Sequence, residues 1–214
     1  MEYPRIWLAA HGGAEAMEDY EGDIPLAVLA VLAKDPDVSV RELAAMNERT
    51  PPDVLRKLGN DEANTVRELV AANPSTPADV LEKFALDDQV FQAIVAGNPS
   101  LPVEMLRRLA VSEHPNVRHW VAANPNTPED ILRSETWPAD EHGLSRNPAV
   151  PLDMLRKLSH SKSAHVRMRV AQNPVATDGM LRRLARDLYD EVKKAAVKSL
   201  RERGAPRVLK PKKH

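Results

Sequence analysis

An asparagine, usually followed by proline, recurs about every 26 residues along most of this chain. The copies stand at spacings of 26, 25, 26, 23 and 26 residues: Asn47, Asn73, Asn98, Asn124, Asn147 and Asn173. A period of this length indicates repeated units, each of which buries its apolar face only against its neighbours. We therefore expect one elongated stack, whose long surfaces favour binding over catalysis.

Each copy predicts two short helices. The first follows Thr-Pro-x-Asp, as at residues 76–79, where Thr serves as the cap, Pro as the first helical residue and the acid as a favourable charge. Its buried stripe has the spacing of Leu81 and Phe84. The second reads Val-Arg-x-x-Val-Ala-x-Asn, with Val66 and Val70 on one face. It ends at Asn-Pro because proline disfavours helical geometry in the residue before it. The predicted class is all-α.

Composition narrows the classes further. Hydrophobic residues make up 43% of the chain and aromatic residues only 4%, so we expect a core of Leu, Val, Met and Ala. The absence of cysteine excludes disulfides, thiolate metal sites and a cysteine nucleophile. The amino terminus lacks the layout of a signal peptide, and no apolar run approaches the roughly 18 residues of a membrane span. A cytoplasmic protein with no membrane partner is expected.

Charge is distributed unevenly. Residues 1–104 carry 8 Lys/Arg and 19 Asp/Glu, a net charge of −11, whereas residues 105–214 carry 22 and 12, a net charge of +10. In a rod-like stack these halves lie at opposite ends, which predicts a strong electric dipole.

The run Val-Arg-x-x-Val-Ala-x-Asn-Pro-x-Thr-Pro, followed by Leu-x-x-Leu-Ala, resembles the leucine-rich repeat variant family. The resemblance implies a right-handed solenoid of about seven repeats over residues 21–200, in which α-helices alternate with 3₁₀-helices. Residues 1–20 are then an N-terminal cap segment, and residues 201–214 are a basic tail that we expect to be disordered. Some members carry an iron-sulfur cluster on cysteines. This chain has none, so no cofactor is expected.

The recurring asparagines are predicted to form a structural ladder by bonding the backbone of the adjacent copy, with ligand binding as the alternative. An arginine stands six residues before four of them: Arg41, Arg67, Arg118 and Arg167. An acid lies six residues before each of the first two, Asp35 and Asp61, and we expect these acids to pair locally with Arg41 and Arg67 as part of the scaffold.

Later copies replace that acid by Ser112 and Ser161, which predicts that Arg118 and Arg167 are free to bind a partner's phosphate or carboxylate. Further binding candidates in the basic half are Arg146, Arg169, Trp137 and His142. Trp120 stands at an apolar helix position and is expected in the core.

The copy after Asn124 departs from the rule at residues 133–146: it is three residues short and lacks the Val-Arg helix, so it marks either a bend or a functional loop. No catalytic or metal site is expected anywhere. The histidine pairs at 114/119 and 160/165 are five apart rather than four, and no Gly-rich phosphate loop or nucleophile motif occurs.

The leading hypothesis is a non-enzymatic scaffold that binds another macromolecule, above all a protein, along one face. The alternative is a nucleic-acid-binding solenoid that uses Arg118, Arg167, Arg169 and the basic tail. A third hypothesis is salt-dependent self-association, in which the acidic end of one molecule docks on the basic end of the next.

Overall fold

The computed structural model describes residues 24–134 and 140–204. All regular structure in these residues is α-helical, and the 14 helices form seven consecutive pairs. The predicted all-α class and the seven two-helix copies are therefore confirmed. Both helices of a pair are α-helices in the described residues, so the 3₁₀-helices that the resemblance implies are not found there. The chain divides into two compact units, Met1–Leu109 and Ala110–His214.

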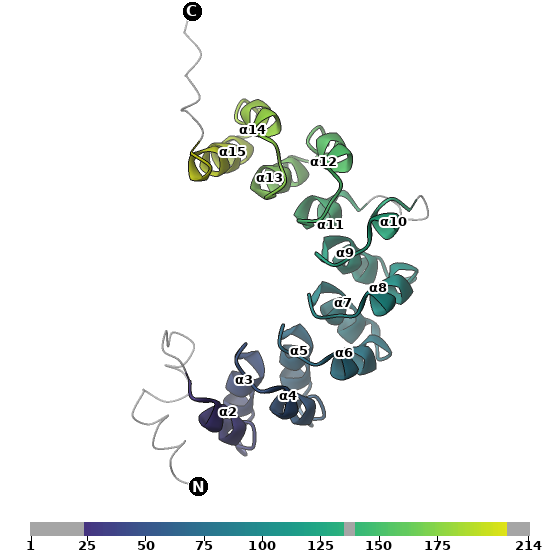
Figure 1. The fold of residues 1–214 in the computed structure, drawn as a ribbon, viewed down its shortest axis with the longest axis vertical. Helices are drawn as coiled ribbons and strands as arrows, with labels where there is room; N and C mark the ends of the chain where they lie inside the picture. Colours follow the sequence, from purple (N-terminus) through teal and green to yellow (C-terminus); the bar gives the residue numbers. More distant parts are fainter. Residues whose placement is uncertain (1–23, 135–139, 205–214) are drawn as a thin grey trace, which may run out of the picture. The chain divides into compact units, whose positions relative to one another are not determined.

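Unit 1 contains two rows of helices (Figure 1). The first helices of the copies form one row: α2 (Leu26–Leu32), α4 (Pro52–Leu58), α6 (Ala78–Ala85) and α8 (Val103–Ala110). The second helices form the other: α3 (Val38–Met46), α5 (Asn64–Ala72) and α7 (Gln89–Gly97). Within the second row, α5 packs between α3 and α7.

Unit 2 repeats this arrangement (Figure 1). Its first helices are α10 (Glu129–Leu132), α12 (Leu152–Leu158) and α14 (Asp178–Leu184). Its second helices are α9 (Pro115–Ala123), α11 (Glu141–Arg146), α13 (Ala164–Gln172) and α15 (Asp190–Glu202). In this row α11 packs between α9 and α13, and α13 packs against α15.

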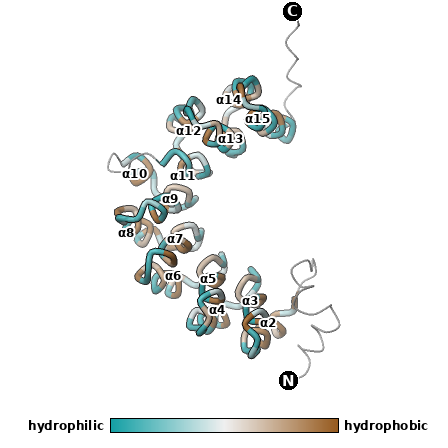
Figure 2. The backbone as a smooth tube through the Cα atoms, turned by 180° about the vertical axis from the view of Figure 1, so that it is seen from behind, coloured by the Kyte–Doolittle hydropathy of each residue, from teal (hydrophilic) through white to brown (hydrophobic). Residues whose placement is uncertain are grey.

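The core follows the apolar stripes that the sequence predicts. Leu55, Leu81, Leu155 and Leu181 of the first helices are fully buried, and so is Val66 of α5. Figure 2 shows hydrophobic and hydrophilic positions on the same helices, as expected of short amphipathic helices that bury one face. Burying an aliphatic side chain stabilises by roughly 1.5–3 kcal/mol, which helices of seven to nine residues need because they are not stable alone.

The threonine of Thr-Pro does not cap the helix that follows it, contrary to the prediction. The N-caps of α4 and α6 are Pro51 and Pro77, without a side-chain capping bond. The buried Thr50 and Thr76 instead donate their hydroxyl backwards, at 2.5 Å, to carbonyl oxygens of the preceding helix. The threonine thus satisfies an acceptor at the end of the second helix, which otherwise has no partner inside that helix.

The recurring asparagine links successive copies. The Nδ2 of Asn73 donates to the carbonyl oxygens of Ala45 at 2.7 Å and Asn47 at 2.9 Å, and its Oδ1 accepts the N–H of Ser75 at 2.9 Å. Asn98 in unit 1, and Asn147 and Asn173 in unit 2, make the same pair of donations one copy further on. Asn47 of the first copy and Asn124 accept the N–H two residues later in the same way.

The copy after Asn124 has the shortest of the described helices, because α10 has four residues and α11 has six. The prediction that it lacks its second helix is wrong, since α11 occupies that place. Asp140 caps α11 by accepting the N–H groups of His142 and Gly143, both at 3.1 Å. Gly143 lets α11 approach α9 closely, because a Cβ there would lie 2.6 Å from the carbonyl oxygen of His119.

Replacing Gly143 by alanine should lower the melting temperature, because the added Cβ forces backbone atoms of α9 and α11 apart and such overpacking costs about 1–3 kcal/mol. The matched control is Gly179→Ala in α14, where a Cβ would meet only Thr177 Oγ1 at 3.8 Å. Alanine is favoured over glycine in a helix, so this control should melt at or above the wild-type temperature. Equal melting temperatures of the two variants, measured by circular dichroism, would contradict the close approach.

Candidate functional site

The arginine that precedes the asparagine pairs across copies rather than within its own copy. Arg41 donates from Nε and Nη2 to the carboxylate of Asp61, 20 residues later, at 2.8 and 2.9 Å. Its Nη1 donates to the backbone carbonyl of Asp35 at 3.0 Å. Arg67 likewise donates to the backbone carbonyl of Asp61, at 2.7 Å. The predicted local pairing of these acids is wrong by one copy, because each turn offers its carbonyl to its own arginine and its side chain to the arginine before it.

Arg167 is not free, contrary to the prediction. It donates from Nε and Nη2 to the carboxylate of Asp187 at 2.7 and 2.9 Å, and the two side chains are only 12% and 9% exposed. The hydrogen bonds from Arg167 hold the pKa of Asp187 below its usual range. Arg167 therefore belongs to the scaffold.

The serine that suggested a free arginine has another partner. Ser161 donates to Glu141 of the preceding copy at 2.5 Å. Glu141 stands six residues before Asn147 and so takes the arginine's place. Arg118 is half-buried and donates to the carbonyl oxygens of Ser112 and Glu113 at 2.7 and 3.0 Å. The position 20 residues beyond Arg118 is not among the described residues.

We expect Asp187→Asn to lower the free energy of unfolding by about 1.5 kcal/mol at neutral pH, because it leaves the Arg167 guanidinium nearly buried without its counter-charge. Since the native pKa of Asp187 is lowered, this stability is present above the unfolded value of about 4 and is lost as the pH falls through the native value. The gap between wild type and variant should therefore close below about pH 4.

Asp153→Asn is the matched control for urea unfolding. Arg133 lowers the pKa of Asp153 to about 2, but their side chains are 42% and 56% exposed, and exposed pairs contribute little stability. A larger loss in the Asp153 variant than in the Asp187 variant would contradict this account.

Several of the remaining binding candidates meet on one face of unit 2. We call this the basic face and define it by residues of α9, α11 and α13: Trp120, His142, Arg146, His165 and Arg169. The guanidinium of Arg146 lies 5.9 Å from the centre of the Trp120 ring, and the rings of His142 and His165 are 5.5 Å apart. Arg169 donates to His165 at 3.5 Å and to Gln172 at 3.3 Å.

Positive charge dominates the basic face. Burial lowers the pKa of His165, and the nearby Arg169, His142 and Arg146 lower it further, against a smaller opposing effect of Glu191 on α15. No carboxylate of the described residues forms an ion pair with Arg146 or Arg169. A carboxylate at the edge of the face, Asp140, lies 2.6 Å from His119 and caps α11.

Two earlier predictions change here. Trp120 is 37% exposed and is not a core residue. It stands four residues before Asn124, and Arg169 stands four residues before Asn173, so both take the same exposed position of their helices. Reading the chain by repeat position would have found Trp120 and also His165. Trp137 is not among the described residues.

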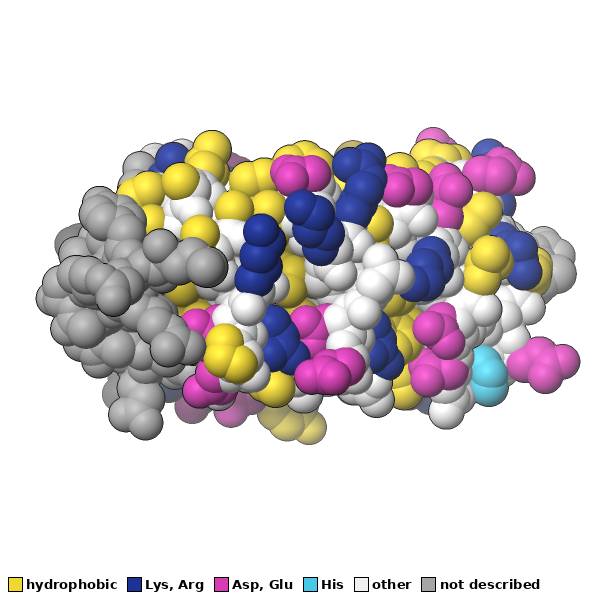
Figure 3. All heavy atoms as spheres, turned by 90° about the horizontal axis from the view of Figure 1, so that it is seen from below, with side chains coloured by type: hydrophobic (Ala, Val, Ile, Leu, Met, Phe, Trp, Pro, Cys, Tyr) yellow, Lys and Arg dark blue, Asp and Glu magenta, His cyan; other side chains and the backbone are white. Residues whose placement is uncertain are grey.

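Elsewhere on the molecule the charges are mixed. On the face shown in Figure 3, Lys and Arg side chains lie among Asp and Glu side chains rather than in one patch. No group of three or more His, Asp or Glu side chains in the described residues is arranged to hold a metal ion. None of the described helices is long and apolar enough to cross a membrane.

The stacked two-helix copies define a helical repeat protein. The family model that matches is the leucine rich repeat variant, at residues 65–89, so the resemblance to that family is confirmed for this copy. A solved structure described as "a leucine-rich repeat variant with a novel repetitive protein structural motif" is 28% identical, with a TM-score of 0.45, and the match covers 92% of this chain and 82% of that one. Among curated proteins no match was found.

Proposed function

We propose that this helical repeat protein is a non-enzymatic scaffold that binds a partner protein, and that the basic face receives an acidic segment of that partner. The observation that carries the proposal is the exposed Trp120 ring, which lies beside the guanidinium of Arg146. Tryptophan and arginine are the residues most enriched where a few side chains supply most of the binding energy between proteins.

Charge complementarity selects the partner. Arg146 and Arg169 present guanidinium groups whose charge no described carboxylate balances, so an acidic segment would gain ion pairs without displacing existing ones. Their side chains come from α11 and α13, which pack against each other, so an extended segment running across both helices reaches the two arginines and Trp120 together.

The experiment measures fluorescence anisotropy of labelled peptides rich in Glu and Leu, with neutral peptides for comparison. The double variant Arg146→Gln/Arg169→Gln should weaken binding of the acidic peptides by about tenfold or more, and so should Trp120→Ala. The control Arg182→Gln/Arg186→Gln removes the same charge from α14 and the turn after it, and should change affinity by less than about threefold. Equal losses in both double variants would show that only net charge matters and would overturn the proposal.

Binding should also strengthen as the pH falls. His165 is neutral at pH 7 because its pKa is lowered, and an acidic segment on the basic face favours its protonated form. Affinity for the same peptides should therefore rise below about pH 6.5, and His165→Gln should remove most of that rise. An unchanged pH dependence in His165→Gln would place the titrating group elsewhere.

Nucleic acid is the second candidate, favoured by the net charge of +10 in residues 105–214. Its test is anisotropy of labelled DNA and RNA at several salt concentrations. Single- or double-stranded oligonucleotides that bind more tightly than the acidic peptides, with a steep loss of affinity in salt, would replace the protein-binding proposal. Light scattering at low and high salt tests self-association, which requires a mass that falls as salt rises.

A further inference from the structure

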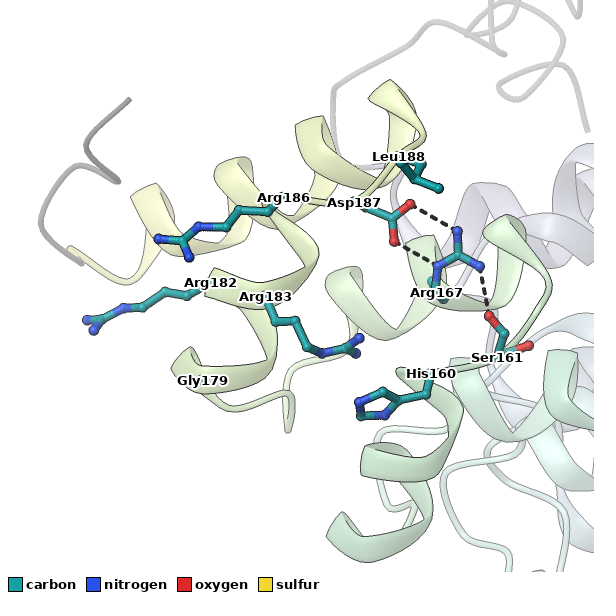
Figure 4. Close-up of a pocket in the computed structure, with 9 residues that line it drawn as sticks. All are labelled: His160, Ser161, Arg167, Gly179, Arg182, Arg183, Arg186, Asp187 and Leu188. Atoms are coloured by element: carbon teal, nitrogen blue, oxygen red, sulfur yellow. Dashed lines mark hydrogen bonds and ion pairs between the residues drawn. The ribbon is translucent and has the colours of Figure 1, made fainter. Parts of the chain in front are cut away.

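A cavity of about 860 Å³ opens in unit 2 where the turns after α12 and α14 come together (Figure 4). None of the five residues of the basic face lines it. Its charged lining consists of four arginines, one histidine and one carboxylate: Arg167, Arg182, Arg183, Arg186, His160 and Asp187.

The carboxylate does not balance this charge. Asp187 is committed to Arg167 by two hydrogen bonds, which Figure 4 shows at the edge of the cavity. Arg183 donates to the backbone carbonyl of Ser159, a neutral partner. The remaining two arginines are exposed. Arg182 reaches the carboxylate of Asp178 only at 4.0 Å.

Arg186 has no ion pair with any carboxylate of the described residues. The lining therefore keeps an excess of three guanidinium charges, those of Arg182, Arg183 and Arg186. Such an excess favours a multiply charged anion.

Comparison with other copies explains why this charge is left over. In the copies at α6 and α12, an aspartate two residues before the first core leucine pairs with the arginine of the preceding first helix: Asp79 with Arg56 at 3.0 Å, and Asp153 with Arg133 at 2.8 Å. In α14 the same position is Gly179, which lines the cavity. A side chain there would meet open space, so the site lacks the acid that its counterparts have.

The arrangement of the arginines indicates the size of the anion. In Figure 4 the side chains of Arg182 and Arg186, one helical turn apart, extend in the same direction, whereas Arg183 extends toward His160. Guanidinium groups bind phosphoryl oxygens through paired N–H donors, and two neighbouring phosphoryl groups carry about three negative charges. A diphosphate therefore matches both the charge and the two directions from which it is presented.

We propose that the cavity is a binding site for a diphosphate group, held by Arg182 and Arg186 on one side and by Arg183 with His160 on the other. The group belongs either to inorganic diphosphate or to an organic diphosphate ester. The site is separate from the basic face, so it stands or falls independently of the protein-binding proposal.

Calorimetric titration of the full chain with inorganic diphosphate tests the site, and the decisive variant returns the missing acid. Gly179→Asp should weaken diphosphate binding by about tenfold or more, although it removes no arginine, because the new carboxylate competes for the same guanidinium groups. Gly179→Asn, of nearly the same shape without the charge, should stay within about threefold of wild type. Circular dichroism of both variants confirms that they are folded.

Two further comparisons complete the test. Arg182→Gln/Arg186→Gln should lose binding, whereas Lys198→Gln/Arg201→Gln, which removes the same charge from α15, should keep it. Adenosine diphosphate that binds more tightly than inorganic diphosphate assigns the site to esters, and the reverse order assigns it to the inorganic ion. Absence of diphosphate binding by wild type at low salt, equal affinities of Gly179→Asp and Gly179→Asn, or monophosphate binding as tight as diphosphate would overturn the proposal.

Discussion

The side-chain amide of the recurring asparagine is the interaction on which the stacking of copies depends. Each copy ends its second helix with backbone carbonyl groups that have no partner within the helix. Asn73 supplies two donors to such carbonyls of the copy before it, at 2.7 and 2.9 Å, and its own oxygen holds the turn that follows. Only an amide offers two donors and an acceptor at this size, which explains why asparagine recurs while its neighbours vary.

The period of the repeat follows from the same bond. Because Asn147 reaches back to the carbonyls of Ala122 and Asn124, the copy between them keeps its place in the stack although it is three residues short. The missing length is taken from α10 and α11, and Gly143 lets the shortened α11 pack against α9. The side chains that vary between copies are then free to differ, and they produce both the basic face and the cavity beside Gly179.

Much of this could be predicted from the sequence, because the repeat fixes which residues occupy equivalent positions. The helix pairs, the buried leucines and the place of the asparagines all follow from a pattern within one copy. The partners of Arg41 and Arg167 could not be assigned in that way. Their acids lie 20 residues later, in the next copy, and a pattern confined to one copy points to the wrong carboxylate.

Exposure was also difficult to predict for the second helices. Trp120 stands at an apolar spacing in α9, but the helices of this row leave one stripe open, so the same spacing describes both a core residue and an exposed one. Comparison between copies resolves this, because the position of Trp120 is held by Arg169 in α13 and an unpaired guanidinium is rarely buried. The same comparison identifies Gly179 as the place where an expected acid is missing.

The most direct test of the asparagine ladder is the free energy of unfolding of Asn73→Asp between pH 4 and 8, with Asn60→Asp on an exposed turn as control. A carboxylate at position 73 would face two carbonyl oxygens without a proton to donate, so we predict a loss of about 3 kcal/mol at pH 7. This loss should diminish as the pH falls through the raised pKa of the introduced acid, because its protonated form donates one hydrogen bond. A variant that is as stable as wild type at pH 7, or as insensitive to pH as the control, would contradict the ladder.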